Sequence, residues 1–172
     1  VMTAMRYWHP MNDAVQDELV KEEVDEVVLL TLYPHFSYST TASSLNEWYR
    51  RVRARKLENK WKTLLVKDYH HHYKYIQAIS QRIDEGLKQF PEEVKDEIHL
   101  LFSAHGTPVS FREAGDPYSF QIKETMEAVM EHRGKDLPYW LSFQSRVGPI
   151  KWLAPNTEDF LEVRLGFGIN HL

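Results

Sequence analysis

Hydrophobic residues along the chain follow two alternating patterns. Short apolar runs alternate with segments in which apolar residues recur every three or four positions, the period of an amphipathic helix. Strands that alternate with helices are typical of a parallel sheet with flanking helices, so the pattern predicts the α/β class. Strands are expected over residues 26–32, 62–66, 98–102 and 139–143, and residues 1–7 look like the end of a further strand. Helices are expected over residues 11–19, 45–54, 76–87, 122–130 and from 157 onward.

Four segments rich in polar and aromatic residues follow the expected strands. They cover residues 33–44, 68–73, 103–116 and 144–152. Ligands of open parallel sheets bind at the carboxyl ends of the strands. We therefore expect these four loops to converge on one crevice.

The length of the chain fits one domain or parts of two. Its 172 residues, 42% of them hydrophobic, are enough for a sizeable core. The chain starts with Val1 inside an apparent strand, so we expect it to begin in mid-domain. No repeat, low-complexity run or Gly/Ser linker marks a boundary, and we place one between residues 1–58 and 59–172.

Composition and motifs exclude several function classes. The 21 basic and 25 acidic residues give a net charge of -4 and no sequence-wide attraction to nucleic acid or anionic lipid. Without cysteine, the chain holds no disulfide, thiolate zinc site, cysteine-ligated iron–sulfur cluster or cysteine nucleophile. No apolar run approaches the ~20 residues that span a bilayer, so we expect a soluble protein without a retained export signal. The GxSxG, GxxxxGK[ST], GxGxxG and HExxH motifs are missing from the sequence.

His105 is the leading candidate for chemistry. It comes just beyond the expected strand 98–102, and Gly106 and Pro108 follow it in a turn. A neutral imidazole in such a loop accepts a proton or ligates a metal. Taken alone, a histidine that only caps a strand end is the commoner arrangement.

Two segments near the amino terminus suit a flat, acidic ligand. Arg6 offers a guanidinium for a carboxylate, and Tyr7 offers an aromatic face. Residues 33–41, including Tyr33 and Ser39, mix aromatic rings with hydroxyls that stack on a flat ring or cap a helix. For Arg6 and Tyr7, the alternative is a surface arginine and a core tyrosine. For residues 33–41, the alternative is a helix cap with aromatic residues in the core.

Three adjacent histidines, His70, His71 and His72, suggest a metal site at first sight. Neighbouring residues do not face one centre from either a helix or a strand. We therefore predict a solvated turn before a helix, in which His72 is the one that points inward.

Three segments occur in the order LTLYPHFSYSTTASSLN (30–46), LLFSAHGTPVSFREAGDPY (100–118) and SFQSRVGPIKWLAP (142–155). Together they resemble the ferrochelatase family, whose members insert ferrous iron into a porphyrin. The resemblance covers Ala4 to Glu162, about the middle half of a family member. It implies a chelatase-like fold with two similar Rossmann-like halves, both incomplete here. The amino-terminal portion and the downstream acidic motif of the family lie outside this chain.

The resemblance also implies an activity and roles for individual residues. The expected reaction inserts ferrous iron into protoporphyrin IX to give protoheme, and Leu45 favours protoporphyrin over coproporphyrin by the same likeness. Iron is the substrate metal, no organic cofactor is needed, and the setting is cytoplasmic with peripheral membrane contact at most. His105 would be the catalytic residue and metal ligand. The porphyrin-binding residues would be Arg6, Tyr7, Tyr33, Ser39, Gln144 and Ser145.

Two other interpretations remain at this point. The first is a non-catalytic remnant that binds a tetrapyrrole or is purely structural. For Gly148, Pro149 and Trp152, a structural turn around a buried tryptophan is as good an explanation as contact with a porphyrin. A related chelatase that uses cobalt or an earlier tetrapyrrole ranks last, because it shares the metal chemistry without these three segments.

Overall fold

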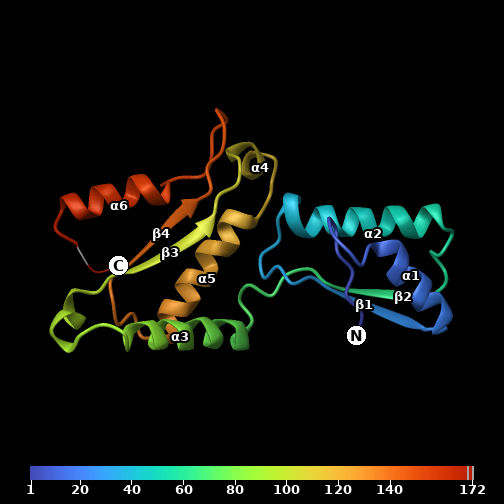
Figure 1. Cartoon of the computed structure of the whole chain (residues 1–172), viewed down its shortest axis with the longest axis horizontal. Helices are drawn as coiled ribbons and strands as arrows, with labels where there is room; N and C mark the ends of the chain where they lie inside the picture. The colour runs from blue at the N-terminus through green and yellow to red at the C-terminus, as the bar shows by residue number, and fades with distance from the viewer. Residues whose placement is uncertain (170, 172) are drawn as a thin grey trace. The chain divides into compact units, whose positions relative to one another are not determined.

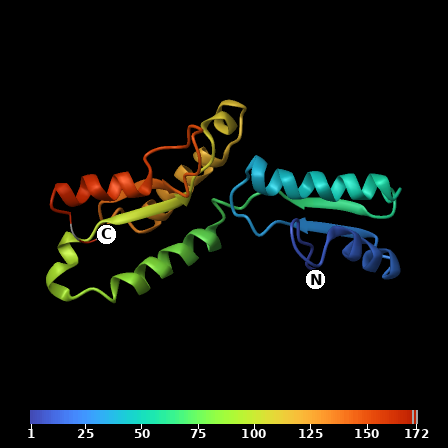
Figure 2. The same cartoon turned by 45° about the horizontal axis from the view of Figure 1, so that its top comes forward.

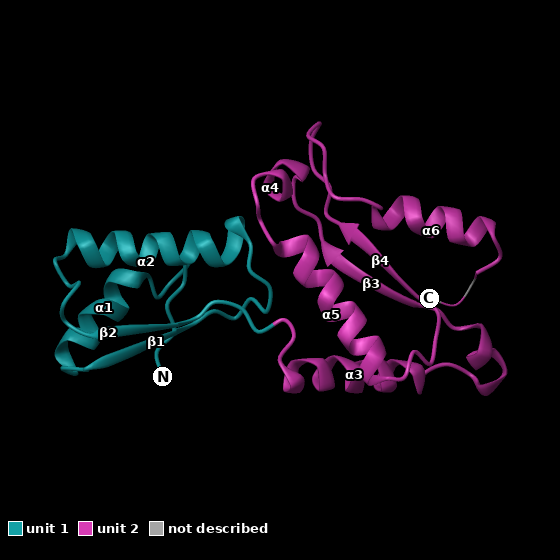
Figure 3. Ribbon diagram, turned by 180° about the vertical axis from the view of Figure 1, so that it is seen from behind, with its two compact units in different colours: residues 1–69 teal, residues 70–172 magenta. Residues whose placement is uncertain are grey.

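The structure is a computed structural model that describes residues 1–169 and 171. It divides into two compact units, residues 1–69 and 70–172 (Figure 3). Each unit contains one pair of parallel strands with helices beside it. The prediction of an α/β protein with parallel strands and flanking helices is confirmed.

The division between the units comes later in the chain than the expected boundary between residues 58 and 59. The strand β2 (Lys62–Val66) pairs in parallel with β1 (Glu26–Leu30), from Glu26 opposite Lys62 to Leu30 opposite Val66. This pairing keeps β2 in unit 1, so the change of unit follows Tyr69.

Unit 1 is built around one apolar cluster. The helices α1 (Asn12–Lys21) and α2 (Ser43–Ala54) contribute residues four positions apart, and α2 runs alongside the strands (Figures 1 and 2). Of the apolar residues in the helix predicted over 11–19, Val15 and Leu19 are buried on α1, whereas Met11 precedes the helix and is exposed. The cluster consists of Val15, Leu19, Val27, Trp48, Val52, Leu57 and Trp61.

Unit 2 contains two long helices, α3 and α5, and a pair of parallel strands, β3 and β4. The helix α3 (Tyr73–Leu87) is followed by a 3₁₀ helix η2 (Glu92–Glu97), β3 (Leu100–His105) and α4 (Val109–Glu113). The helix α5 (Tyr118–His132), β4 (Tyr139–Gln144) and α6 (Thr157–Gly166) complete it. Figure 1 shows α5 crossing α3 beside the sheet, and α6 beside β4.

The core of unit 2 centres on α5. Met126, Val129 and Met130 recur at the spacing of one helix face, and the last two are fully buried. At the end of α5, the buried guanidinium of Arg133 contacts Asp84 of α3 at 2.5 Å and Asp136 at 2.6 Å. Burial alone would lower the pKa of Arg133, but the two carboxylates outweigh it and raise the pKa. Arg133 thus ties α5 to α3.

Some element bounds differ from the prediction. Residues 1–7 form no strand; Met5 makes an isolated bridge to Met11, because its N–H donates to the Pro10 carbonyl 2.8 Å away in a turn. The third strand is Leu100–His105, which makes His105 its last residue. In the part of the chain that the structure describes, no helix has both the length and the apolar character needed to cross a membrane.

Candidate functional site

His105 lies where two parallel strands end together. It is opposite Gln144 in the register of β3 and β4, and the N–H of Gly106 donates to the Gln144 carbonyl at 2.8 Å. A Cβ at position 106 would lie 2.9 Å from that carbonyl oxygen, closer than real Cβ atoms come. The absence of a side chain at Gly106 therefore lets the strand ends meet. His105 and Gln144 are both exposed.

The loops that follow β3 and β4 are joined to each other. Leu153 donates its N–H to the Thr107 carbonyl at 3.0 Å, and Val109 donates to the Lys151 carbonyl at 2.9 Å. Two of the four predicted loops are therefore brought together within unit 2. The pairing fixes the exit of the chain from His105.

A tryptophan closes the second of these loops. The indole N–H of Trp152 donates to the Val147 carbonyl at 2.9 Å, and the backbone of Ser145 and Gly148 has positive φ values of 70° and 68°. A positive φ suits Gly148 and is uncommon for a serine. These contacts favour a structural turn at Gly148 and Trp152, although Trp152 is half-buried rather than buried as that interpretation expected. The side chains of Gln144 and Ser145 stay exposed.

Beneath the loop of His105, the start of α5 is fixed by a buried carboxylate. Asp116 accepts the N–H of Tyr118 at 3.0 Å. Burial, and then the charge of Asp116, raise the pKa of Tyr118 to about 12, and interaction of its hydroxyl with the His105 backbone opposes the shift. Tyr118 is thus a neutral phenol that positions the end of β3. The amino-acid pattern around Tyr118 gives no sign of this contact.

In unit 1, Arg6 and Tyr7 meet at the beginning of α2. The Arg6 Nε donates to Ser43 Oγ at 3.3 Å, and the Tyr7 hydroxyl lies 3.0 Å from the same oxygen. The Arg6 guanidinium is 4.6 Å from the centre of the Tyr7 ring. Tyr7 is 69% exposed, so the alternative of a core tyrosine is wrong. The pair presents a cation and an aromatic face to solvent.

Tyr33 and Ser39 belong to the loop between β1 and α2. Ser37 begins the π-helical segment η1 (Tyr38–Ala42), where its buried hydroxyl accepts the N–H of Ser39 at 3.4 Å and lies 3.1 Å from the Ser39 hydroxyl. Helix capping therefore explains the Ser37 and Ser39 hydroxyls. Tyr33 is exposed.

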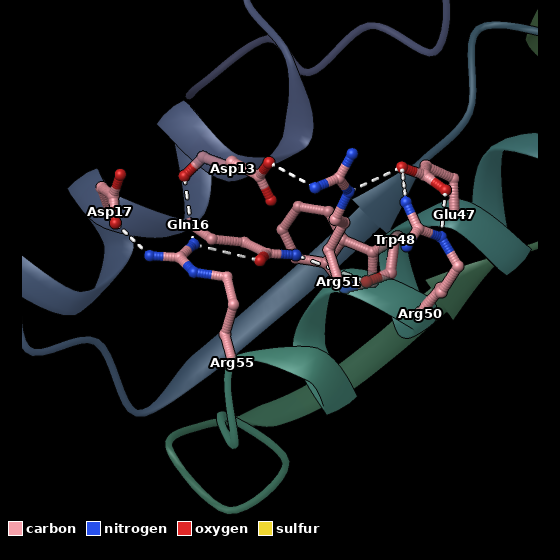
Figure 4. Close-up of polar contacts among 8 residues, drawn as sticks. All are labelled: Asp13, Gln16, Asp17, Glu47, Trp48, Arg50, Arg51 and Arg55. Atoms are coloured by element: carbon pink, nitrogen blue, oxygen red, sulfur yellow. Dashed lines mark hydrogen bonds and ion pairs between the residues drawn. The ribbon is translucent and has the colours of Figure 1, made fainter.

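A network of charges holds α2 against α1, next to the groove that Arg6 lines (Figure 4). Glu47 accepts hydrogen bonds from Arg50 and from Arg51 at 2.7 Å, and Arg51 also contacts Asp13 of α1 at 2.8 Å. Hydrogen bonds from Arg50 and Arg51 lower the pKa of Glu47 to about 2. Glu47 therefore stays ionised and paired with the two arginines beside the groove.

The prediction that His72 is the inward histidine is wrong. His72 is exposed, and its Nδ1 accepts the N–H of Lys74 at the start of α3. His70 is the buried one. The three histidines lie in a turn before α3, which has neither helical nor strand periodicity. The side-chain directions expected from those two geometries therefore do not apply to them.

Comparison with known proteins agrees with the motifs in both units. The Ferrochelatase family model matches residues 1–172, the whole chain. The chain belongs to the ferrochelatase family. The resemblance carried by the three segments is therefore confirmed, and the parallel strand pairs are consistent with the chelatase-like fold.

Ferrochelatases of bacteria are among the similar proteins. The chain is 42% identical over 162 residues to a ferrochelatase of Picosynechococcus sp., which covers 94% of this chain and 42% of that protein. It is 41% identical over 170 residues to a ferrochelatase of Geobacter metallireducens, covering 99% of this chain and 52% of that protein. The chain spans about half the length of the curated relatives it matches.

Proposed function

We propose that this chain carries the metal-handling histidine of a ferrochelatase and takes part in inserting ferrous iron into protoporphyrin IX, giving protoheme. The observation that carries the proposal is the family match over residues 1–172, combined with an exposed imidazole at the joined ends of β3 and β4. The resemblance calls for no organic cofactor. It is also the basis for proposing a cytoplasmic setting with peripheral membrane contact at most.

His105 suits the proton and metal steps of such a reaction. Insertion must remove two pyrrole protons from the porphyrin and water from the metal. A neutral imidazole accepts a proton or ligates a divalent ion near pH 7. His105 is exposed, and within residues 1–169 and 171 no hydrogen bond to its ring is found. The paired loops and Gly106 hold the backbone from which the ring projects.

The remaining family positions would bind the porphyrin. Arg6 would pair with a carboxylate of the macrocycle and Tyr7 would offer a stacking surface, because both are accessible at the start of α2. Gln144 and Ser145 adjoin His105 and would contact the ring edge. Tyr33 and Ser39 would line the loop between β1 and α2; Ser39 does so in addition to its pairing with Ser37.

A binding segment without catalytic turnover is the second candidate. It is favoured by the share of the curated relatives that the chain covers, 42% in the Picosynechococcus protein. An anaerobic absorbance assay of the 172-residue chain with ferrous iron separates the two, with protoporphyrin and coproporphyrin as parallel substrates. Formation of protoheme faster than in buffer supports the enzyme. A porphyrin spectral shift without metalation supports the binding segment, and faster metalation of coproporphyrin would overturn the proposed substrate.

A further inference from the structure

Ser43 holds together the two side chains that the amino-terminal segment presents to solvent. The Nε–H of Arg6 donates to Ser43 Oγ at 3.3 Å, and the Tyr7 hydroxyl lies 3.0 Å from the same oxygen. A serine oxygen has two lone pairs and one proton, so it can serve both partners at once. Residues 1–11 belong to no helix or strand, whereas Ser43 is the first residue of α2. Ser43 therefore attaches Arg6 and Tyr7 to a regular element of unit 1.

The bond to Ser43 also determines which edge of the Arg6 guanidinium is left for a ligand. A guanidinium binds a carboxylate through two parallel N–H groups. Ser43 takes the Nε–H, and among the residues that the structure describes the two terminal nitrogens of Arg6 make no hydrogen bond. These two nitrogens form the end of the fork, so a carboxylate would bind Arg6 end-on.

The groove beside Arg6 contains no carboxylate that pairs with it. The residues that line this groove are Arg6, Tyr38, Ser43, Asn46, Glu47 and Arg50. Glu47 pairs with Arg50 and with Arg51, each at 2.7 Å, and Arg51 also contacts Asp13 (Figure 4). In the described part of the chain, Arg6 forms no ion pair. The positive charge of the groove that remains for an anion is thus the one that Ser43 orients.

We propose that Ser43 is a positioning residue that aims Arg6 at a carboxylate of the porphyrin. This inference rests on the proposed function, because it requires that Arg6 binds the macrocycle. An arginine side chain that is fixed before binding loses less rotamer entropy when the ligand arrives. Loss of the Ser43 hydroxyl therefore weakens the binding of a porphyrin with free carboxylates more than that of a porphyrin without them.

Fluorescence titration of the whole chain with protoporphyrin IX and with its dimethyl ester, in a mild detergent buffer, tests this role. The ester keeps the ring but has no negative charge. We expect the parent chain to favour the free acid by about tenfold and Arg6→Gln to lose this preference. Ser43→Ala should weaken binding of the free acid by about fivefold and that of the ester by less than about twofold.

Two further variants separate positioning from folding. Ser43→Thr keeps a hydroxyl and should keep the preference for the free acid. Ser44→Ala is the matched control, because Ser44 is the next residue of α2 and its side chain makes no hydrogen bond within residues 1–169 and 171. Its affinities should equal those of the parent. Circular dichroism checks that each variant has the helix content of the parent.

The outcomes distinguish this inference from the proposed function. If Arg6→Gln loses the preference and Ser43→Ala keeps it, the inference is wrong and the porphyrin-binding role of Arg6 stands. If Arg6→Gln keeps the preference, the role of Arg6 is wrong and the inference fails with it. Equal weakening of acid and ester binding in Ser43→Ala would show a structural role and overturn the inference.

A measurement without porphyrin tests the anchor itself. The heteronuclear NOE of the Arg6 Nε–H, measured by ¹⁵N NMR, reports how mobile the guanidinium is. We expect a lower value in Ser43→Ala and the parent value in Ser44→Ala. An unchanged value in Ser43→Ala would overturn the inference even if the chain binds no porphyrin.

Discussion

The substitution Gly106→Ala tests the joined strand ends beneath His105. The new Cβ would lie 2.9 Å from the Gln144 carbonyl oxygen, 3.5 Å from a ring carbon of Trp152 and 3.7 Å from the Cβ of Phe143. The first neighbour is backbone in a parallel ladder, so it cannot rotate away. The strand ends must separate by several tenths of an ångström, which weakens the Gly106–Gln144 hydrogen bond of 2.8 Å.

The magnitude follows from two opposing effects. Overpacking a tight site costs about 1–3 kcal/mol. The φ of Gly106 is outside the left-handed region, so alanine adopts the backbone without strain and gains about 0.4–1 kcal/mol by restricting the unfolded chain. We expect a net loss of about 1–2 kcal/mol in the free energy of unfolding, together with weaker porphyrin binding.

Urea unfolding followed by tryptophan fluorescence measures this loss, and Gly86→Ala is the matched control. Gly86 lies in α3, and a Cβ at that position would have no described neighbour within 4 Å. Alanine there should stabilise the chain by about 0.5–1 kcal/mol, because glycine is a poor helix former. A Gly106→Ala chain at least as stable as the parent would refute the close approach of the strand ends.

Further predictions concern two charged networks. Arg133→Met should lower the free energy of unfolding by about 1–2 kcal/mol in urea titrations, since it removes the buried link to Asp84 and Asp136, both partly exposed and able to regain water. An unchanged midpoint would show that the link is not stabilising. The folded-state pKa of Glu47 is depressed to about 2 from 4.5, so its contribution to stability is present above about pH 4.5 and is lost as the pH falls toward 2. Glu47→Gln should be less stable than the parent at about pH 6 and equal to it near pH 2, and a difference independent of pH would contradict the ion pairing.

Much of the fold could be predicted from the spacing of apolar residues. The stripe of Val15 and Leu19 and that of Met126 and Val129 are buried on their helices, because a face that repeats about every 3.6 residues has to pack. The pairing of the strands could not be predicted from the spacing of apolar residues. That β2 pairs with β1, and belongs to unit 1, depends on contacts between distant segments.

The candidate residues of the site could be named from the sequence, but the contacts that position them could not. His105 was singled out because it follows an apolar run that ends in a turn. The contact of Tyr118 with the His105 backbone depends on where α5 begins in space. The burial of His70 was missed for the same reason, since a turn with neither helical nor strand periodicity leaves the direction of each side chain open.

The central claim is that His105 handles protons or metal in porphyrin metalation. The most direct measurement is the initial rate of metalloporphyrin formation by the 172-residue chain under anaerobic conditions, compared with His105→Ala and the control His132→Ala. Loss of a general base costs about 10²–10⁴-fold, so we expect His105→Ala to fall by at least about 100-fold while His132→Ala keeps the parent rate. Equal rates for the parent and His105→Ala would contradict the claim.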